Sequence, residues 1–376
     1  MSGEQIRAPL RVLVTGASGW LGQFLLQALE KLAENAPPLS YEVFGTYSRV
    51  RPGWADRVRA SLLPLTLESR ESVREVLEAA SPDVIVHLAA MSSPAHCERD
   101  SSKGLVVNAP SVFIEEVEAF SSACAFIFTS TDLVYDGENA PYSPSSRPSS
   151  PPINAYGESK LRCEELVLSK MKLSLILRLS NVIGPAFALQ HTGMKFFDWL
   201  STAHGKREYC GLRWDEIRSF VYVEDVVRVI CRAVASLAAY KQRPSLPASI
   251  DNSRLTGWEE LNRKVLNVGG PRGLSRLDLG ILLADCKAAG SVIVDERMDP
   301  EAPKYGCTED MSSSWRVYKT TNAESVASSG ITNPRDVTMD STATERLLGF
   351  RFTDMQETIP LCLGLLIRHE VELKYR

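Results

Sequence analysis

A phenol and an amine stand four residues apart in Tyr156-Gly-Glu-Ser-Lys160, a pair suited to moving a proton. On a helix this spacing places both side chains on one face. A free phenol with a pKa of about 10 is a poor acid or base at neutral pH, so we expect the Lys160 ammonium to lower that pKa. Thr131, near the end of an earlier apolar run, would hydrogen-bond the reacting oxygen. The three residues predict acid–base catalysis, and the alternative is a surface pair that arose by chance.

Three glycines follow the first apolar run in Gly16-Ala-Ser-Gly19-Trp-Leu-Gly22, where a helical pattern begins. Glycine permits a tight turn and a close approach of the backbone to a pyrophosphate, while a helix N-terminus offers unpaired N–H groups. The pattern predicts a dinucleotide site, and the alternative is an ordinary strand-to-helix turn. We expect the following residues to contact the cofactor: Gly16, Ser18, Gly19, Trp20, Leu21 and Gly22.

The second apolar run is followed by Tyr47-Ser48-Arg49-Val50-Arg51, with no acidic residue to bind a ribose hydroxyl. Guanidinium groups pair well with a phosphate. Ser48 and Arg49 therefore favour NADP(H), with NAD(H) possible, and a solvated basic loop is the alternative. At the end of the apolar run at 84–88, Leu88, Ala89 and Ala90 leave space for the adenine-ribose half of a dinucleotide.

The elements that must position these groups follow from the spacing of apolar runs, at 11–15, 43–47, 84–88, 125–129 and 173–179. Near-continuous apolar strands separated by helical stretches predict a parallel sheet covered on both faces. We expect an α/β fold with a Rossmann-type doubly wound sheet over residues 8–183, completed by segments around 218–235 and 264–270. Residues 184–376 would mostly form a smaller C-terminal α/β lobe that binds the substrate.

The composition excludes several other classes of protein. A net charge of −4 in 376 residues argues against a nucleic-acid partner. The eight cysteines include no Cys-x-x-Cys pair, so neither a zinc site nor a disulfide framework is predicted, and we expect no metal. No apolar run reaches the roughly 20 residues of a membrane span, and the first residues lack the features of a signal peptide. A cytoplasmic location is the expectation.

Several motifs together resemble the extended short-chain dehydrogenase/reductase superfamily, which includes NAD-dependent epimerases and dehydratases. Besides the glycine turn and Tyr-x-x-x-Lys, they are Val107-Asn108-Ala109, Leu177-Arg-Leu-Ser-Asn181 and Arg218-Ser-Phe-Val-Tyr-Val-Glu-Asp225. The resemblance implies cofactor contacts from Asn108, Leu179, Tyr156 and Lys160. It also implies substrate contacts from Asp132, Asn181 and Arg218, although Arg218 could equally pair with Glu216 or Glu224 in a solvated salt bridge.

Within that superfamily, Thr129-Ser-Thr-Asp-Leu-Val-Tyr-Asp-Gly137 is similar to the dTDP-4-dehydrorhamnose reductase branch. It is equally similar to the regulatory β subunits of methionine adenosyltransferase. Sugar dehydratases of the superfamily place Asp-Glu after the threonine, and Asp132-Leu133 argues against dehydration. We expect an NAD(P)-dependent oxidoreductase that acts on a nucleotide-sugar carbonyl. The alternatives are a nucleotide-sugar 4-epimerase and an NADP-binding regulatory subunit, and the partner would be a small-molecule substrate, with a homodimer or a partner enzyme possible.

Overall fold

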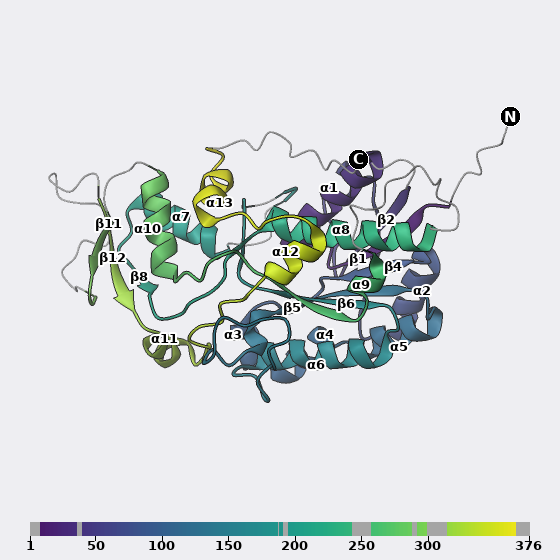
Figure 1. Ribbon diagram of the computed structural model, residues 1–376, viewed down its shortest axis with the longest axis horizontal. Helices are drawn as coiled ribbons and strands as arrows, with labels where there is room; N and C mark the ends of the chain where they lie inside the picture. The colour runs from purple at the N-terminus through teal and green to yellow at the C-terminus, as the bar shows by residue number, and fades with distance from the viewer. Residues whose placement is uncertain are drawn as a thin grey trace.

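The computed structural model describes residues 8–35, 40–186, 188–190, 195–242, 257–287, 292–298 and 314–365. Two lobes lie side by side, a large one built on a central sheet and a smaller one that contains β8, β11 and β12 (Figure 1). Within the described part of the chain, no helix is both long enough and apolar enough to cross a membrane.

The large lobe contains a seven-stranded parallel sheet in the order β10-β6-β5-β4-β1-β2-β3. Its strands are β1 (Leu10–Thr15), β2 (Tyr41–Tyr47), β3 (Ser61–Pro64), β4 (Val84–His87), β5 (Ala125–Thr131), β6 (Ser174–Leu179) and β10 (Lys264–Val268). The direction of strand order reverses between β1 and β4, which is where doubly wound sheets bind their ligands. The predicted fold class is confirmed.

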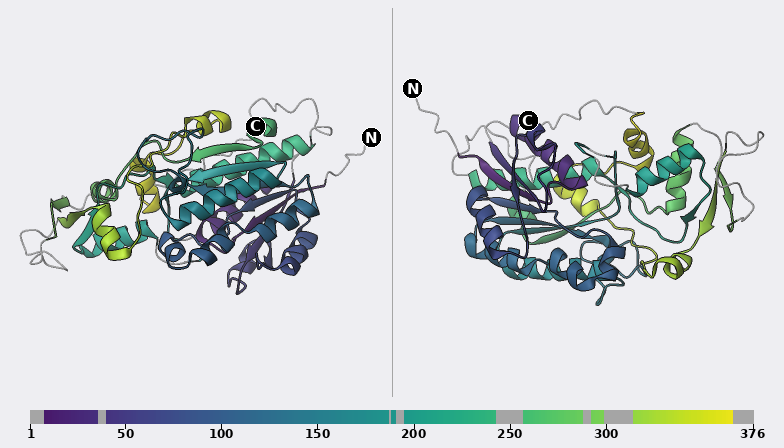
Figure 2. Two further views of the ribbon diagram at one scale, coloured as in Figure 1. Left: turned by 90° about the horizontal axis from the view of Figure 1, so that it is seen from below. Right: turned by 180° about the vertical axis from the view of Figure 1, so that it is seen from behind.

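Helices cover both faces of this sheet (Figure 2). One face is covered by α1 (Trp20–Asn35), α8 (Val223–Gln242), α9 (Trp258–Leu261) and α12 (Thr342–Leu348). On the other side lie α2 (Arg70–Ala80), α3 (Pro94–Arg99), α4 (Ser101–Asn108), α5 (Ser111–Phe120) and α6 (Ala155–Lys170). Short 3-10 turns occur at η1 (Ala55–Arg57) and η2 (Asp132–Val134).

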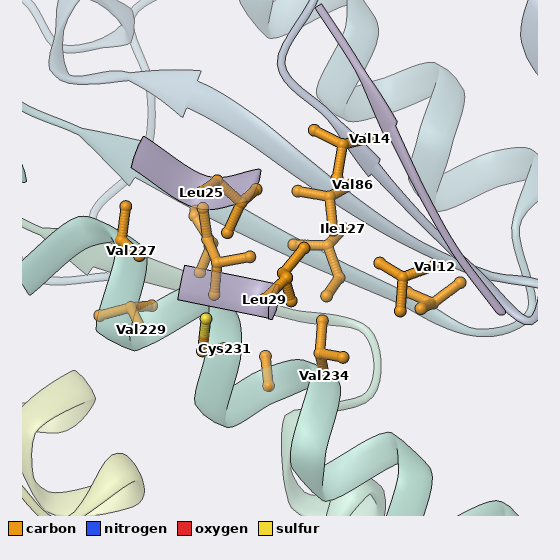
Figure 3. Packing of buried hydrophobic residues seen from close by; sticks show 14 of the residues in the cluster. Val12, Val14, Leu25, Leu29, Val86, Ile127, Val227, Val229, Cys231 and Val234 are labelled. Atoms are coloured by element: carbon orange, nitrogen blue, oxygen red, sulfur yellow. The ribbon is translucent and has the colours of Figure 1, made fainter. Parts of the chain in front are cut away.

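The apolar strand residues alternate between two cores, because successive strand side chains point to opposite faces. Val12 and Val14 pack with Leu25 and Leu29 of α1 and with α8, as Figure 3 shows. Leu13, between them, packs on the other side with residues of α2, α5 and α6. Both faces of the sheet are therefore buried, which explains why its strands read as continuous apolar runs.

Of the two segments expected to complete the sheet, one adds a strand to it and the other does not. Residues 264–268 form β10 beside β6, within the expected range. Around 218–235, by contrast, Val221–Tyr222 (β9) pairs with Val182–Ile183 (β7) in a separate two-stranded sheet, and α8 then covers a face of the large sheet. The apolar residues of this segment recur with helical spacing, at Val223, Val226, Val227, Ile230 and Val234, so they form one buried helical face.

The smaller lobe has its own core. Its parallel sheet has the order β11-β12-β8 and consists of β8 (Cys210–Arg213), β11 (Val292–Asp295) and β12 (Trp315–Thr320). The accompanying helices are α7 (Phe196–Lys206), α10 (Arg276–Cys286), α11 (Asn322–Ser329) and α13 (Met355–Cys362). Leu200, Leu212, Leu279 and Trp315 meet in the core of this lobe. Residues after 184 therefore serve both lobes, since α8, α9, β10 and α12 return to the large sheet.

Candidate active site

A cavity of about 660 Å³ lies at the carboxyl ends of the central strands. Residues of both lobes line it, so it faces the glycine turn on one side and the start of α7 and α10 on the other. Of the residues predicted from the sequence, the cavity is lined by Gly16, Ser18, Gly19, Trp20, Leu21, Gly22, Ser48, Leu88, Ala89, Ala90, Thr131, Asp132, Tyr156, Lys160, Leu179 and Asn181.

The glycine turn has a shape that other residues could not adopt. Gly16 has a φ of +68°, and a Cβ placed there would lie 2.8 Å from the backbone of Ala89. A Cβ on Gly22 would lie 2.7 Å from the Cα of Ala17. The turn is closed by the Gly19 N–H, which donates to the Gly16 carbonyl at 2.9 Å. Helix α1 begins next to the cavity at Trp20, and the N–H groups of a first helical turn suit an anion, so these residues fit a dinucleotide pyrophosphate.

The start of α6 brings Tyr156 next to Thr131. The Asn154 side chain caps this helix by accepting from the Gly157 N–H at 2.9 Å. A Cβ on Gly157 would lie 2.2 Å from the Leu133 carbonyl oxygen, so only glycine lets α6 press this closely on the segment that follows Thr131. The Thr131 hydroxyl accepts from the Leu133 N–H at 3.2 Å and donates to Oδ1 of Asp132 at 3.2 Å, and it is close enough to the Tyr156 phenol to lower its pKa.

The electrostatics of Tyr156 differ from the sequence-based expectation. Burial raises its pKa, the neighbouring Asp132 and Cys97 raise it further, and the nearby Thr131 hydroxyl lowers it in part. The expected lowering is therefore wrong for the chain by itself, because desolvation disfavours the phenolate more than its neighbours stabilise it. Burial also lowers the pKa of Lys160, to about 8, and its Nζ lies 4.2 Å from the centre of the Phe128 ring. At neutral pH the phenol keeps its proton.

Two predicted cofactor residues lie outside the cavity lining. Asn108 is fully buried, accepts from the Met91 N–H at 2.7 Å and donates to the Ser159 hydroxyl at 2.9 Å. It therefore joins α4 to α6 and to the segment after β4. Arg49 is exposed and directly follows Ser48, which lines the cavity.

Of the predicted substrate residues, Asp132 and Asn181 line the cavity and Arg218 does not. Asp132 lies in the cavity wall and accepts from the Ser180 hydroxyl at 2.8 Å, while burial raises the pKa of its carboxyl. Arg218 is 3% exposed, donates from Nη2 to Glu216 at 3.1 Å and is absent from the cavity lining. Its Nη1 atom has no hydrogen-bond partner within the described ranges.

Sequence reasoning missed the residues that the smaller lobe brings to the cavity, namely Lys195, Phe196, Phe197, Phe220 and Arg276. The Arg276 guanidinium lies 4.3 Å from the centre of the Phe196 ring, and its Nη2 is 3.9 Å from Glu216. Its Nε atom has no hydrogen-bond partner within the described residues. Phe220 lies within the motif at 218–225, but no local motif marks the other four residues, which meet only when α7 and α10 pack together.

The sheet, the glycine turn and the helix that carries Tyr156 and Lys160 define a dinucleotide-binding protein of the extended short-chain dehydrogenase/reductase class. The model of the NAD dependent epimerase/dehydratase family matches residues 12–244. The chain therefore belongs to this family of enzymes, whose cofactor is a nicotinamide dinucleotide.

The chain is similar to curated proteins of two kinds. The chain is 31% identical over 241 residues to methionine adenosyltransferase 2 subunit beta of Danio rerio, and the match covers 64% of this chain and 68% of that protein. It is 26% identical over 263 residues to the spore coat polysaccharide biosynthesis protein SpsK of Bacillus subtilis, covering 69% of this chain and 80% of the relative.

Solved structures share the fold at low identity. UDP-glucose 4-epimerase of Thermotoga maritima, solved with UDP-glucose, superposes with a TM-score of 0.66 at 22% identity and covers 94% of this chain and 97% of its own. dTDP-4-dehydrorhamnose reductase of Bacillus anthracis, in complex with NADP, gives a TM-score of 0.65 at 17% identity, covering 96% and 100%. At these identities the structures establish the fold alone.

Proposed function

We propose that this chain uses NADPH to reduce a carbonyl group on a nucleotide-linked sugar. The observation that supports this most is that Tyr156 and Thr131 line one cavity with the glycine turn, and burial raises the pKa of the phenol so that it keeps its proton. A group that holds its proton at neutral pH is suited to give it to an oxygen that becomes basic during reduction.

Each residue has one task in this proposal. A reduced nicotinamide, when bound, supplies the hydride that the carbonyl carbon receives. Tyr156 donates its proton to the carbonyl oxygen, so that the product is an alcohol. Thr131 donates a hydrogen bond to the same oxygen and orients it. Lys160, as an ammonium, stabilises the phenolate that remains on Tyr156.

The proposed preference for NADP(H) rests on Arg49. The nearby Arg51 is already paired with Asp56, with Nη2 and Oδ1 2.7 Å apart. Arg49 directly follows the cavity residue Ser48 and has no ion pair within the described residues, so its guanidinium is available for the 2′-phosphate.

For the substrate, we assign the anionic contact to Arg276. Arg276 lines the cavity, whereas Arg218 is buried outside the cavity lining. Both arginines lie close to the carboxylate of Glu216. Burial lowers the pKa of Arg276 to about 10, which still leaves it charged at neutral pH. A diphosphate group would give the guanidinium the hydrogen-bond acceptor that Glu216 does not supply, with Asn181 and Asp132 nearer the reacting sugar.

Epimerisation is the enzymatic alternative. It would use the same phenol as a base, because an epimerase must begin by removing a proton from a sugar hydroxyl. Dehydration would need a second carboxylate after Asp132, where the chain has Leu133.

A regulatory role is a second candidate, because a relative at 31% identity is named as a subunit of methionine adenosyltransferase. In that case the chain would bind NADP tightly and would associate with a partner enzyme without turnover. Co-purification with a methionine adenosyltransferase, together with tight NADP binding and no NADPH oxidation, would favour this role.

The deciding experiment is incubation of the purified protein with NADPH and a panel of 4-keto nucleotide sugars. Reduction predicts loss of absorbance at about 340 nm and an alcohol product visible by mass spectrometry, at a rate on the order of 1 per second. Binding of NADPH without oxidation by any sugar of the panel would contradict the proposal. Conversion of a nucleotide sugar without net NADPH oxidation would point to the epimerase.

A further inference from the structure

We propose that Glu164 is a positioning residue that holds α6 against β5 and β6 and keeps the amine of Lys160 charged. Glu164 is buried and lies on the far side of Lys160 from Tyr156 along the helix. Residues four apart on a helix lie on the same face, so Tyr156, Lys160 and Glu164 form one line.

The Glu164 carboxylate is held from two strands. Arg178 of β6 donates from Nε to Oε1 at 2.9 Å and from Nη2 to Oε2 at 2.6 Å. Ser130 of β5, the residue before Thr131, donates its hydroxyl to Oε1 at 2.5 Å. The helix that carries the phenol is therefore fixed relative to the strand that carries the threonine.

The same network continues to the edge of the sheet. Arg178 donates from Nη1 to the Tyr135 hydroxyl at 2.9 Å, and this hydroxyl donates to Oδ1 of Asn267 in β10 at 3.0 Å. Arg178 and Glu164 are 5% and 3% exposed. Their ion pair is thus screened little by water, and loss of one partner would leave the other charge uncompensated.

Lys160 needs such a carboxylate because its surroundings favour the neutral amine. The neighbouring His87 of β4 is itself buried, its pKa is lowered to about 3 and it is therefore neutral at pH 7. Cys97 of α3 and Cys163 of α6 are thiols in their ordinary state, with pKa values that burial raises. The Asp132 carboxyl of η2 acts on Tyr156. Burial lowers the pKa of Lys160 to about 8, and Cys163, Glu164 and Cys97 act in the opposite direction. Because the two thiols are neutral at pH 7, Glu164 is the one of these three groups that carries a negative charge.

Because Arg178 pairs with the same carboxylate, the proposal predicts opposite changes in the pKa of Lys160 for substitutions of Glu164 and of Arg178. Glu164→Gln removes the negative charge while the positive charge of Arg178 stays, so the pKa of Lys160 falls. Arg178→Gln removes the competing positive charge, so the pKa of Lys160 rises. A merely structural role predicts something else, because a loosened helix admits water and moves the pKa of Lys160 up towards 10.5 in both variants.

The test is an NMR titration of the full-length protein labelled with [ε-¹³C]lysine, in which Lys160 is assigned as the resonance missing from Lys160→Arg. The Lys160 midpoint should lie near pH 8, fall by roughly one unit in Glu164→Gln and rise in Arg178→Gln. Glu165→Gln is the matched control, since Glu165 is 58% exposed and pairs with Arg162, and it should leave the midpoint unchanged.

An unchanged or raised midpoint in folded Glu164→Gln would overturn the proposal. If that variant does not fold, the double variant Glu164→Gln/Arg178→Gln removes both charges together, and its midpoint must lie below that of Arg178→Gln. The readout requires neither substrate nor turnover, so it stands or fails separately from the proposed reduction.

Discussion

The Thr15 hydroxyl lies 2.8 Å from Nδ1 of His87 and joins the ends of β1 and β4 directly beneath the glycine turn. His87 is fully buried, and its ring packs against Phe113, Phe126 and Phe128. This imidazole therefore helps to fix two strands that meet at the cavity, and it does so in its neutral form.

Acid should destabilise the protein through His87. Burial lowers the pKa of His87 from an ordinary value of 6.5 to about 3, so between these values the unfolded chain binds a proton that the folded chain does not. This contribution to stability is present above pH 6.5 and is lost as the pH falls. Between pH 6.5 and 5, the free energy of unfolding measured in urea should fall by about 1.5 kcal/mol more in the wild type than in His87→Gln. Replacement of the exposed His96 should leave the acid sensitivity unchanged, and equal slopes in wild type and His87→Gln would contradict the assignment.

Removal of the Tyr156 hydroxyl should abolish most of the turnover. Tyr156→Phe keeps the ring but loses the transferable proton, so we expect kcat to fall about 10²- to 10⁴-fold while the Kd for NADPH stays nearly constant. Steady-state kinetics and a fluorescence titration with NADPH measure the two quantities. Tyr240→Phe, at a residue that is 38% exposed, is the control. Retained activity in Tyr156→Phe would move the role of acid to another group.

Gly16 should tolerate no side chain. Gly16→Ala combines a positive φ with a Cβ only 2.8 Å from the backbone of Ala89, so we expect a loss of about 1–3 kcal/mol in stability and much weaker dinucleotide binding. Gly53→Ala is the matched control, because a Cβ there meets nothing within 4 Å. Thermal unfolding with and without NADP⁺ reports both effects, and a Gly16→Ala protein that NADP⁺ still stabilises fully would show that the turn is not the pyrophosphate site.

Arg49 should distinguish the two cofactors. Loss of one charge-assisted pair to a phosphate, worth about 1.5–3 kcal/mol, corresponds to a Kd for NADPH that is roughly 10- to 100-fold weaker in Arg49→Ala. The Kd for NADH should hardly change. Arg51→Ala is the control, since Arg51 is paired with Asp56. Equal weakening for both cofactors would remove Arg49 from the 2′-phosphate.

Arg276 should act on the sugar nucleotide and leave NADPH binding alone. Arg276→Gln is expected to raise the KM for the nucleotide sugar about 10- to 100-fold, with the Kd for NADPH unchanged. Arg272→Gln, which breaks an exposed pair with Asp354, should change neither. A similar effect of Arg276→Gln on a substrate without phosphate would show that the guanidinium binds another part of the ligand.

The sequence alone was sufficient to predict the parts of the candidate site that are built from residues close together in the chain. The glycine turn and the Tyr156–Lys160 face of α6 are local patterns, and the structure brings them to the same cavity as Thr131. The direction of the Tyr156 pKa was not accessible, because it depends on burial by segments far away in the chain. Arg276 was missed for the same reason: it reaches the cavity only through the packing of α10 against α7 and β8.

Strand β10 reaches the outer side of β6 only after the chain has passed through β7, α7, β8, β9, α8 and α9. At a translation speed of about 5–20 residues per second, roughly ten seconds pass between the synthesis of β6 and that of β10, and during this time the outer edge of β6 has no neighbouring strand. A nascent chain in this condition can pair with another copy of itself. Soluble yield in a foreign host should therefore depend on chaperones that shield the growing polypeptide until β10 has paired with β6.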